Sequence, residues 1–166
     1  FCFYSFFFFL ILLCLGHQAP VSCVAFSPSE PVLVSGSWDG SVRIHDIYGR
    51  GKGAGGKQVL RHGETGRDVI CLDFHPEGKE IVVGLLNGSL HFWDVVEGQE
   101  LGTIDGRKDL WGGRRYDDLR TAENSTVNNH FTSVAYGPEG IVCFGVSNSR
   151  WVCMYNVQQK VLIKRF

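Results

Sequence analysis

The stretch VSCVAFSPSEPVLVSGSWDGSVRIHDI, from Val21 to Ile47, is followed by two further copies of its own pattern. The second copy is VICLDFHPEGKEIVVGLLNGSLHFWDV, residues 69–95, and the third is FTSVAYGPEGIVCFGVSNSRWVCMYNV, residues 131–157. Equivalent positions lie 48 residues apart between the first two copies and 62 apart between the last two. Self-similarity of this period is the sequence signature of a repeat architecture. The chain is therefore predicted to stack three related units.

Two sets of landmarks give this spacing independently. Each copy has an aromatic residue two positions before a proline, and near its end a ring-bearing residue precedes Asp or Asn. The first set is Phe26, Phe74 and Tyr136, and the second is His45-Asp46, Trp93-Asp94 and Tyr155-Asn156. Because both sets agree, the alignment is not a chance match.

Each copy divides into short strands joined by tight turns. Alternating apolar residues predict first strands that end at Phe26 and its counterparts. Asp39-Gly40 and Asn87-Gly88 are typical of hairpin turns, in which Gly adopts a positive φ. The second strands are predicted at 32–35 and 81–84, the third at 42–44 and 90–92, and the fourth at 59–60, 101–104 and 161–163. Four antiparallel strands form a propeller blade, so we predict an all-β fold of three four-stranded blades.

The repeat period also sets the expected domain organisation. We expect blades over about 17–60, 61–104 and 129–166, with an inserted loop over about 105–128. Closed propellers typically need about four to eight blades. The chain is therefore interpreted as a fragment, an incomplete β-propeller with an exposed blade edge at each end.

These motifs resemble the WD-repeat family, whose repeat contains Gly-His, Ser-Pro, Asp-Gly and Trp-Asp elements. The first copy matches with Gly16-His17, Ser27-Pro28, Asp39-Gly40 and His45-Asp46, where His45 replaces the family's Trp. The second copy keeps Trp93-Asp94 and has Asn87 in the turn. The third departs further, with Asn148, Tyr155 and Asn156 at these places.

The resemblance implies a hydrogen-bonded tetrad of a His, a turn Asp, a Ser or Thr and the Trp in each blade. No copy carries all four residue types. We therefore expect blades held mainly by apolar packing, with the second and third less rigid. The positions assigned structural roles in the repeat are His17, Ser35, Asp39, Asp46, Asn87, Trp93, Asp94, Asn148 and Tyr155. His17 is expected to bond toward Asp39 and Ser35.

The composition argues against several classes of function. The charges of the 16 basic and 17 acidic residues nearly cancel. The chain therefore lacks the strongly basic character that would indicate a nucleic-acid binder. The six Cys and six His residues show neither metal-ligand spacing nor a catalytic arrangement. We therefore expect no catalytic residue, cofactor or metal. Cys23, Cys71, Cys143 and Cys153 stand in apolar runs, which is typical of buried free thiols in a reducing compartment.

Residues 1–16 form an apolar leader, FCFYSFFFFLILLCLG, without a charged residue. It lacks an initiating Met, a basic leading region and a small-residue cleavage site, and it is shorter than the roughly 20 residues that span a bilayer. Its residue types can all be encoded by pyrimidine-rich codons. We interpret it as a gene-model artefact, and the alternative is a genuine targeting or anchoring segment.

An insertion between Gly102 and Asn129 lengthens the second spacing. It mixes both charge signs with aromatic residues, which fits a protein interface better than a bare phosphate track. The candidate contacts with a partner or with RNA are Arg107, Lys108, Trp111, Arg114 and Arg115. The alternative is a solvated loop whose charges pair with each other.

A second excursion, GRGKGAGGK at residues 49–57, is superficially similar to a phosphate-binding loop. Gln58 follows Lys57 where that motif needs Ser or Thr, and no strand–loop–helix context is expected. We interpret it as a flexible basic loop.

The resemblance extends to tandem-propeller WD-repeat subunits of the nucleolar small-subunit processome. It rests on HQAPVSCVAF, SGSWDGSVRIHDIYGR, the spacer GTIDGRKDLWGGRR and the closing QQKVLIKRF. It implies a non-catalytic scaffold in ribosome biogenesis and small-subunit ribosomal RNA processing, located in the nucleolus. The expected partners are other processome subunits, and precursor ribosomal RNA or small nucleolar RNA through basic loops, but no membrane. The alternative is a WD-repeat adaptor in signalling or ubiquitin-ligase recruitment.

We expect the isolated 166-residue chain to be poorly stable and prone to aggregate, because its blade edges are uncovered. Calorimetry combined with light scattering measures this. A cooperative melt of a monomer would contradict the expectation.

Overall fold

The computed structural model describes residues 16–47, 58–61, 68–110, 129–147 and 151–166, and every regular element in these ranges is a strand. The first sheet contains β1 (Val21–Phe26), β2 (Val32–Ser37), β3 (Ser41–Asp46) and β4 (Gln58–Arg61). The second contains β5 (Val69–Phe74), β6 (Glu80–Leu85), β7 (Ser89–Asp94) and β8 (Glu100–Asp105). The third contains β9 (Phe131–Tyr136), β10 (Val142–Ser147), β11 (Val152–Asn156) and β12 (Val161–Arg165).

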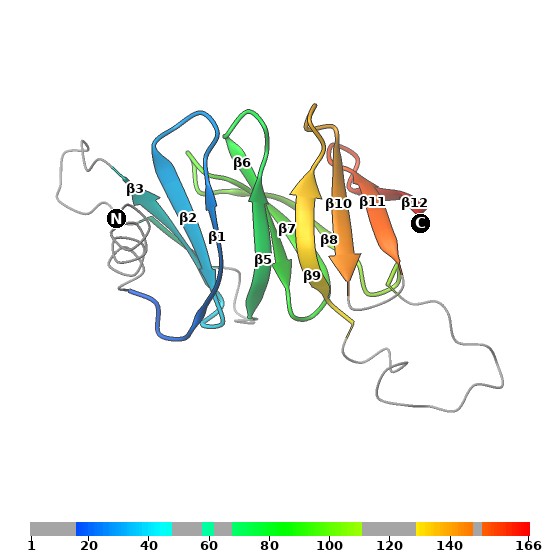
Figure 1. The fold of residues 1–166 in the computed structure, drawn as a ribbon, viewed down its shortest axis with the longest axis horizontal. Helices are drawn as coiled ribbons and strands as arrows, with labels where there is room; N and C mark the ends of the chain where they lie inside the picture. Colours follow the sequence, from blue (N-terminus) through cyan, green and yellow to red (C-terminus); the bar gives the residue numbers. More distant parts are fainter. Residues whose placement is uncertain (1–15, 48–57, 62–67, 111–128, 148–150) are drawn as a thin grey trace, which may run out of the picture.

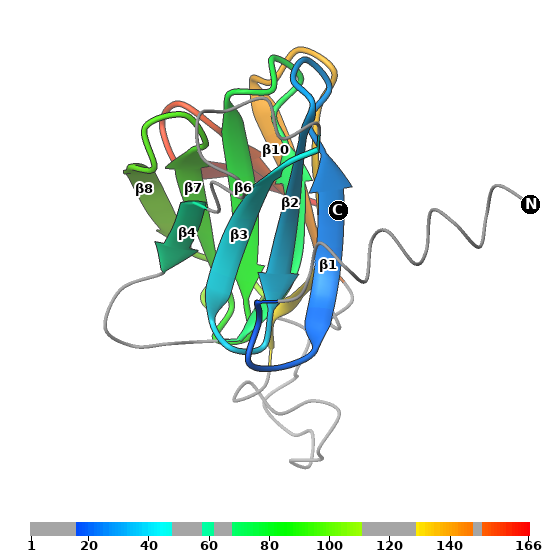
Figure 2. The same cartoon turned by 90° about the vertical axis from the view of Figure 1, so that its left-hand side faces the viewer.

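The three sheets stand side by side in a row (Figure 1). Within each sheet the strands follow chain order and pair antiparallel with their neighbours. Figure 2 shows the strands of the first sheet side by side, in the order β1 to β4 from right to left. The predicted fold class, three antiparallel four-stranded blades, is confirmed. Residues 1–15 of the apolar leader and the Gly-rich excursion at 49–57 lie outside the described residues.

Apolar side chains fill the two spaces between neighbouring blades. Between the first and second blades, Val34, Val42 and Ile44 pack with Leu72 and Phe74. The alternation along β2 and β3 explains this, because residues two apart point to the same face of a sheet. A fully buried side chain of this size contributes about 1.5–3 kcal/mol. The contacts between blades, as well as the pairing within them, therefore stabilise the fold.

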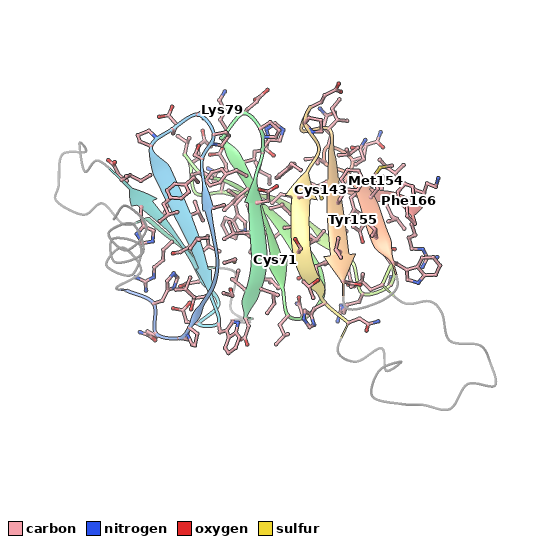
Figure 3. All side chains as sticks on the ribbon, in the orientation of Figure 1. Cys71, Lys79, Cys143, Met154, Tyr155 and Phe166 are labelled. Atoms are coloured by element: carbon pink, nitrogen blue, oxygen red, sulfur yellow. The ribbon has the colours of Figure 1, made fainter. Side chains whose placement is uncertain are left out.

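The same positions recur one blade further along. Val82, Leu90 and Phe92 lie in the core between the second and third blades, with Phe131 and Tyr155. The next equivalents, Phe144, Val152 and Met154, are only partly buried. Figure 3 places Met154 on the last sheet, at the end of the row away from the first blade. The outer face of the third blade thus carries the apolar positions that the first two blades bury.

The turns between the first and second strands interlock from blade to blade. The Ser29 hydroxyl donates a hydrogen bond of 3.0 Å to the Glu77 carbonyl and packs against Gly78. One blade further on, the His75 imidazole lies directly over Gly140, and its edge meets the Tyr136 ring at 5.2 Å between centroids. Gly78 and Gly140 have φ values of +77° and +71°, which favour glycine on backbone grounds as well.

Two further contacts tie the third blade to the second. The Asp73 carboxylate accepts a 2.8 Å hydrogen bond from the Tyr136 backbone amide. The Lys160 ammonium lies 3.5 Å from the centroid of the Phe92 ring, a cation–π contact. Lys160 has φ +55° where the second blade has Gly98, and its stem packs on Gly102. Burial lowers the pKa of Lys160.

Replacing Gly140 with Ala is expected to destabilise the third blade by about 2 kcal/mol or more, because the new Cβ clashes with His75 and the backbone is left-handed. Hydrogen exchange of β9 and β10 in the full-length product of the locus measures the loss. The matched variant His75→Ala/Gly140→Ala should recover about half of it, since only the backbone strain remains. Equal exchange in the single and double variants would contradict the clash.

Candidate interaction site and blade locks

A chain of polar side chains fastens the first blade. The Nδ1 atom of His17 lies 3.0 Å from the Asp39 carboxylate, and its Nε2 atom lies 2.9 Å from the Ser35 hydroxyl. That hydroxyl lies 3.0 Å from Nε2 of His45. The Ser41 hydroxyl donates to Asp39 at 2.6 Å. The network links the loop before β1, the β2–β3 turn, β2 and β3.

Asp39 is the anionic end of this network. Desolvation raises its pKa, but hydrogen bonds from Ser41, the Gln18 amide and His17 outweigh desolvation and hold the pKa well below its ordinary value. A carboxylate whose pKa is lowered by folding stabilises the fold above its unfolded-state pKa. That contribution is lost as the pH falls below about 4.

The first blade lacks the family's Trp, as the sequence indicates, but a continuous polar network still fastens it. His45 stands at the family's Trp position and is 2 % exposed, and its ring nitrogen reaches Ser35 as an indole N–H would. The lock requires a hydrogen-bonding group at that place rather than a particular residue. Buried polar groups that satisfy one another in this way rigidify the region around them.

The second blade uses different residues. The Asn87 side chain accepts hydrogen bonds from the Ser89 amide and hydroxyl, at 3.0 and 2.6 Å. The Ser89 hydroxyl lies 2.9 Å from Nε2 of His91, whose Nδ1 lies 2.6 Å from the Glu100 carboxylate. This network crosses from β7 to β8, whereas the first blade's network connects β3 with β2 and the preceding loop.

Asp94 and Trp93 serve the second blade in other ways. Asp94 accepts hydrogen bonds from the amides of Val96 and Glu97, at 2.7 and 2.8 Å, and so closes the turn before β8. Trp93 packs at the edge of the core between the first two blades. Asp46, the equivalent of Asp94, is exposed, and Asn148 lies outside the described residues.

The third blade is fastened by Asp109, which the sequence analysis did not single out. The Tyr155 hydroxyl donates to the Asp109 carboxylate at 3.0 Å, and the Asp109 carbonyl accepts from Arg165 at 3.2 Å. Tyr155 is fully buried, and burial raises its pKa far above the ordinary value. Its position matches His45 and Trp93 in the repeat, so the third blade again anchors its third strand through a ring-bearing residue.

The insertion is attached at this lock. Leu110, one residue after Asp109, is 1 % exposed and belongs to the core between the second and third blades. The Asn129 side-chain amide donates to the Leu110 carbonyl at 3.3 Å. Gly106 and Leu110, expected at the start of a loop, are therefore buried, and a hydrogen bond joins the residues that flank segment 111–128.

The candidate contact residues differ in their surroundings. Arg107 forms two hydrogen bonds with Asp105, at 2.9 and 3.0 Å, so its guanidinium is paired within the chain. Arg107 and Lys108 are both exposed to solvent. Trp111, Arg114 and Arg115 lie outside the described residues. The alternative to a partner-binding loop is a loop whose charges pair with each other, and Arg107 does pair in this way with Asp105.

The thiols follow the expected pattern in the described ranges. Cys71, Cys143 and Cys153 are buried and Cys23 is half-buried, and all four are free. Burial raises the pKa of Cys23 to about 11 and that of Cys71 and Cys143 to about 12, which makes these thiols poor nucleophiles. No cluster of potential metal ligands occurs among the described residues, and they include no helix that could cross a membrane.

Comparisons with known proteins agree with this geometry. The WD domain, G-beta repeat, matches residues 9–46 and 56–94. Over 151 residues, 91 % of the chain, the sequence is 47 % identical to the periodic tryptophan protein 2 homolog of Schizosaccharomyces pombe. Over the same length it is 38 % identical to periodic tryptophan protein 2 of Arabidopsis thaliana and 35 % identical to the mouse homolog. The chain spans 16–17 %, about one sixth, of the length of these relatives.

Replacing Tyr155 with Phe is expected to destabilise the third blade by about 1–2 kcal/mol, because the bond to Asp109 is lost. Tyr136→Phe is the matched control, since the buried Tyr136 hydroxyl has no hydrogen-bond partner. Its removal should leave stability unchanged or raise it by up to about 1 kcal/mol.

Hydrogen exchange of β10 and β11 in the full-length product measures both effects. Equal losses from the two substitutions would show that the Asp109 bond contributes nothing specific.

Proposed function

Because this chain belongs to the WD-repeat family, we propose that it forms part of a non-catalytic β-propeller scaffold that holds other macromolecules at its turns and loops. The observation that carries the proposal is the anchored insertion at the junction of the second and third blades. Its base contains buried Leu110 and the Asp109–Tyr155 bond, so the chain is held in place where segment 111–128 begins. Propellers suit this task because short hairpins form a rigid frame while the loops vary.

We further propose that the scaffold acts in ribosome biogenesis, in assembly of the nucleolar small-subunit processome and in small-subunit ribosomal RNA processing. Similarity to proteins named periodic tryptophan protein 2 over 91 % of the chain supports this proposal. The resemblance seen in the sequence also rests on the period-breaking spacer GTIDGRKDLWGGRR, which the repeat itself does not require. Since the chain spans about one sixth of those relatives, the activity is proposed for the longer protein.

The three blades are proposed to be part of a larger propeller, with blades at about 17–60, 61–104 and 129–166. The partly exposed Phe144 and Met154 support this, because their equivalents in the first two blades are covered by a following blade. Three blades alone cannot close a ring.

The insertion at about 105–128 is proposed as the docking loop for other processome subunits, with precursor ribosomal RNA or small nucleolar RNA as a further partner of its basic residues. Lys108, Trp111, Arg114 and Arg115 are the proposed contacts. Arg107 is assigned a supporting role, because its pair with Asp105 holds the first turn of the insertion. A partner would have to replace both of those bonds to engage Arg107.

Replacing Lys108, Arg114 and Arg115 together with Glu in the full-length product should reduce copurifying processome subunits and precursor ribosomal RNA by about tenfold, because opposite charge at an interface rim disfavours association. Affinity purification followed by mass spectrometry and RNA quantification measures this. Lys164→Glu, on β12 and outside the insertion, is the matched control.

Two results would count against these proposals. Recovery of signalling or ubiquitin-ligase components without processome subunits would favour the adaptor function. Unchanged recovery of the same partners by the triple variant would retain the scaffold and remove the insertion as its docking loop.

A further inference from the structure

Two apolar side chains stand exposed at the tips of equivalent hairpins. Trp38 lies in the β2–β3 turn with 52 % of its surface exposed, and Leu86 lies in the β6–β7 turn with 44 % exposed. The two positions are 48 residues apart, which is the spacing of the first two copies of the repeat. They therefore occupy the same place in neighbouring blades, at one end of the row.

The lack of a neighbouring blade does not explain this exposure. The second blade has a neighbour on each side (Figure 1), and its Phe74 is buried where the equivalent Phe26 of the first blade is exposed. Leu86 belongs to the same flanked blade and is exposed nevertheless. We therefore expect Trp38 to stay exposed when a further blade covers the outer face of the first.

Each tip is held in place beneath its exposed side chain. The Trp38 amide donates to the Pro20 carbonyl at 3.1 Å, and the Leu86 amide donates to the Asp68 carbonyl at 2.9 Å. The residue that follows each of them belongs to the polar network of its blade. A side chain whose backbone is already ordered loses less conformational entropy on binding, so both tips are suited to act as anchors.

The two ends of the blades are used differently. At the end with the turns between first and second strands, neighbouring blades interlock at Gly78 and Gly140. At the end with Trp38 and Leu86, the second tip instead contacts the insertion. There the Gly106 amide donates to the Gly88 carbonyl at 3.1 Å. The exposed tips therefore adjoin the start of the insertion.

Carboxylates accompany both tips. Asp39 directly follows Trp38, and although desolvation raises its pKa, hydrogen bonds hold the pKa well below its ordinary value. Asp68, whose carbonyl holds the Leu86 amide, directly precedes β5. An acidic group thus stands beside each exposed apolar side chain.

The cations at this end lie outside the two tips. Arg61 ends β4, the outer strand of the first sheet, and Arg107 and Lys108 begin the insertion, where Arg107 is paired with Asp105. At the tips themselves, carboxylates repel a nucleic-acid phosphate and attract a basic side chain. The face of an exposed indole also attracts a cation. These surroundings favour a protein partner over an RNA.

We propose that Trp38 and Leu86 form a docking surface for a protein segment that presents apolar and basic side chains. The indole and the leucine side chain bury against the apolar groups, and Asp68 pairs with a basic one. Tryptophan is among the residues that dominate binding energy once they are buried at an interface. The inference rests on the scaffold function proposed above and specifies where that scaffold binds and which chemistry it recognises.

Site-specific cross-linking in the full-length product of the locus tests the proposal. Trp38 and Leu86 are replaced, one at a time, with the photoreactive residue benzoylphenylalanine, and the cross-linked peptides are identified by mass spectrometry. Both positions should cross-link to one segment of one protein, and that segment should contain apolar and basic residues. Val96, which is 74 % exposed in the β7–β8 turn at the opposite end, is the matched control position and should not reach that segment.

The cross-linked segment, made as a synthetic peptide, then measures what each side chain contributes. Trp38→Ser should weaken binding of this peptide to the full-length product by about tenfold or more, and Leu86→Ser by about threefold or more, because apolar surface buried at the interface is lost. Asp68→Asn should weaken it at low salt and have little effect at high salt, where the ion pair is screened. Val96→Ser should leave it unchanged. Hydrogen exchange of β2 and β3 should not change in Trp38→Ser, because the bond to Pro20 uses only the backbone.

Several results would overturn the proposal: no protein cross-link from either position, cross-links to RNA instead, or a segment without basic residues. Losses of affinity below about threefold in both Trp38→Ser and Leu86→Ser, or an equal loss in Val96→Ser, would overturn it as well. Should hydrogen exchange show that Trp38→Ser loosens its blade, Leu86→Ser decides.

The cross-links also separate this inference from the proposed function. A segment with the expected chemistry from a protein outside the processome would support the docking surface and count against the role in ribosome biogenesis. Copurifying processome subunits without a protein cross-link from Trp38 or Leu86 would do the reverse.

Discussion

A four-stranded blade cannot cover both faces of its own sheet, and this constraint governs the rest of the molecule. Val34 and Ile44 are buried because the second blade covers them, and Val82 and Phe92 are buried because the third blade does. Each blade is therefore stable only as a neighbour of another. The interlocked turns at Gly78 and Gly140 lie at the same junctions and hold neighbouring blades in register.

The fold was predictable because this constraint leaves a pattern in the sequence. Alternating apolar positions and positive-φ turns recur with the blade, and both survive the loss of the family's Trp from the first and third copies. The polar locks were not predictable in the same way. Matching residue types to the family's repeat scores His45 as a mismatch, because the family has Trp at that position. The hydrogen bond itself needs only a ring nitrogen close to Ser35.

Asp109 was missed for a different reason. The second and third copies lie 62 residues apart because the insertion stands between them. A residue at the start of the insertion therefore has no counterpart in the other copies. Burial of Leu110 and the bond to Tyr155 appear only once the chain is folded. The available signal was weak: a buried-type Leu next to an acid, within a segment otherwise rich in Gly and Arg. The contact residues beyond position 110 remain a prediction from sequence.

The lock of the third blade lies where the insertion proposed as a docking loop begins, so the two are expected to affect each other. The cost of closing a loop grows slowly with its length, so a long insertion between Leu110 and Asn129 is tolerated once its ends are joined. A force on the insertion acts first on Asp109, and through it on Tyr155 and β11. A partner that leaves Asp109 in place therefore preserves the third blade's lock, whereas one that pulls Asp109 away leaves the buried Tyr155 hydroxyl unsatisfied. The second outcome costs about 1–3 kcal/mol, which favours partners that bind without displacing the base of the loop.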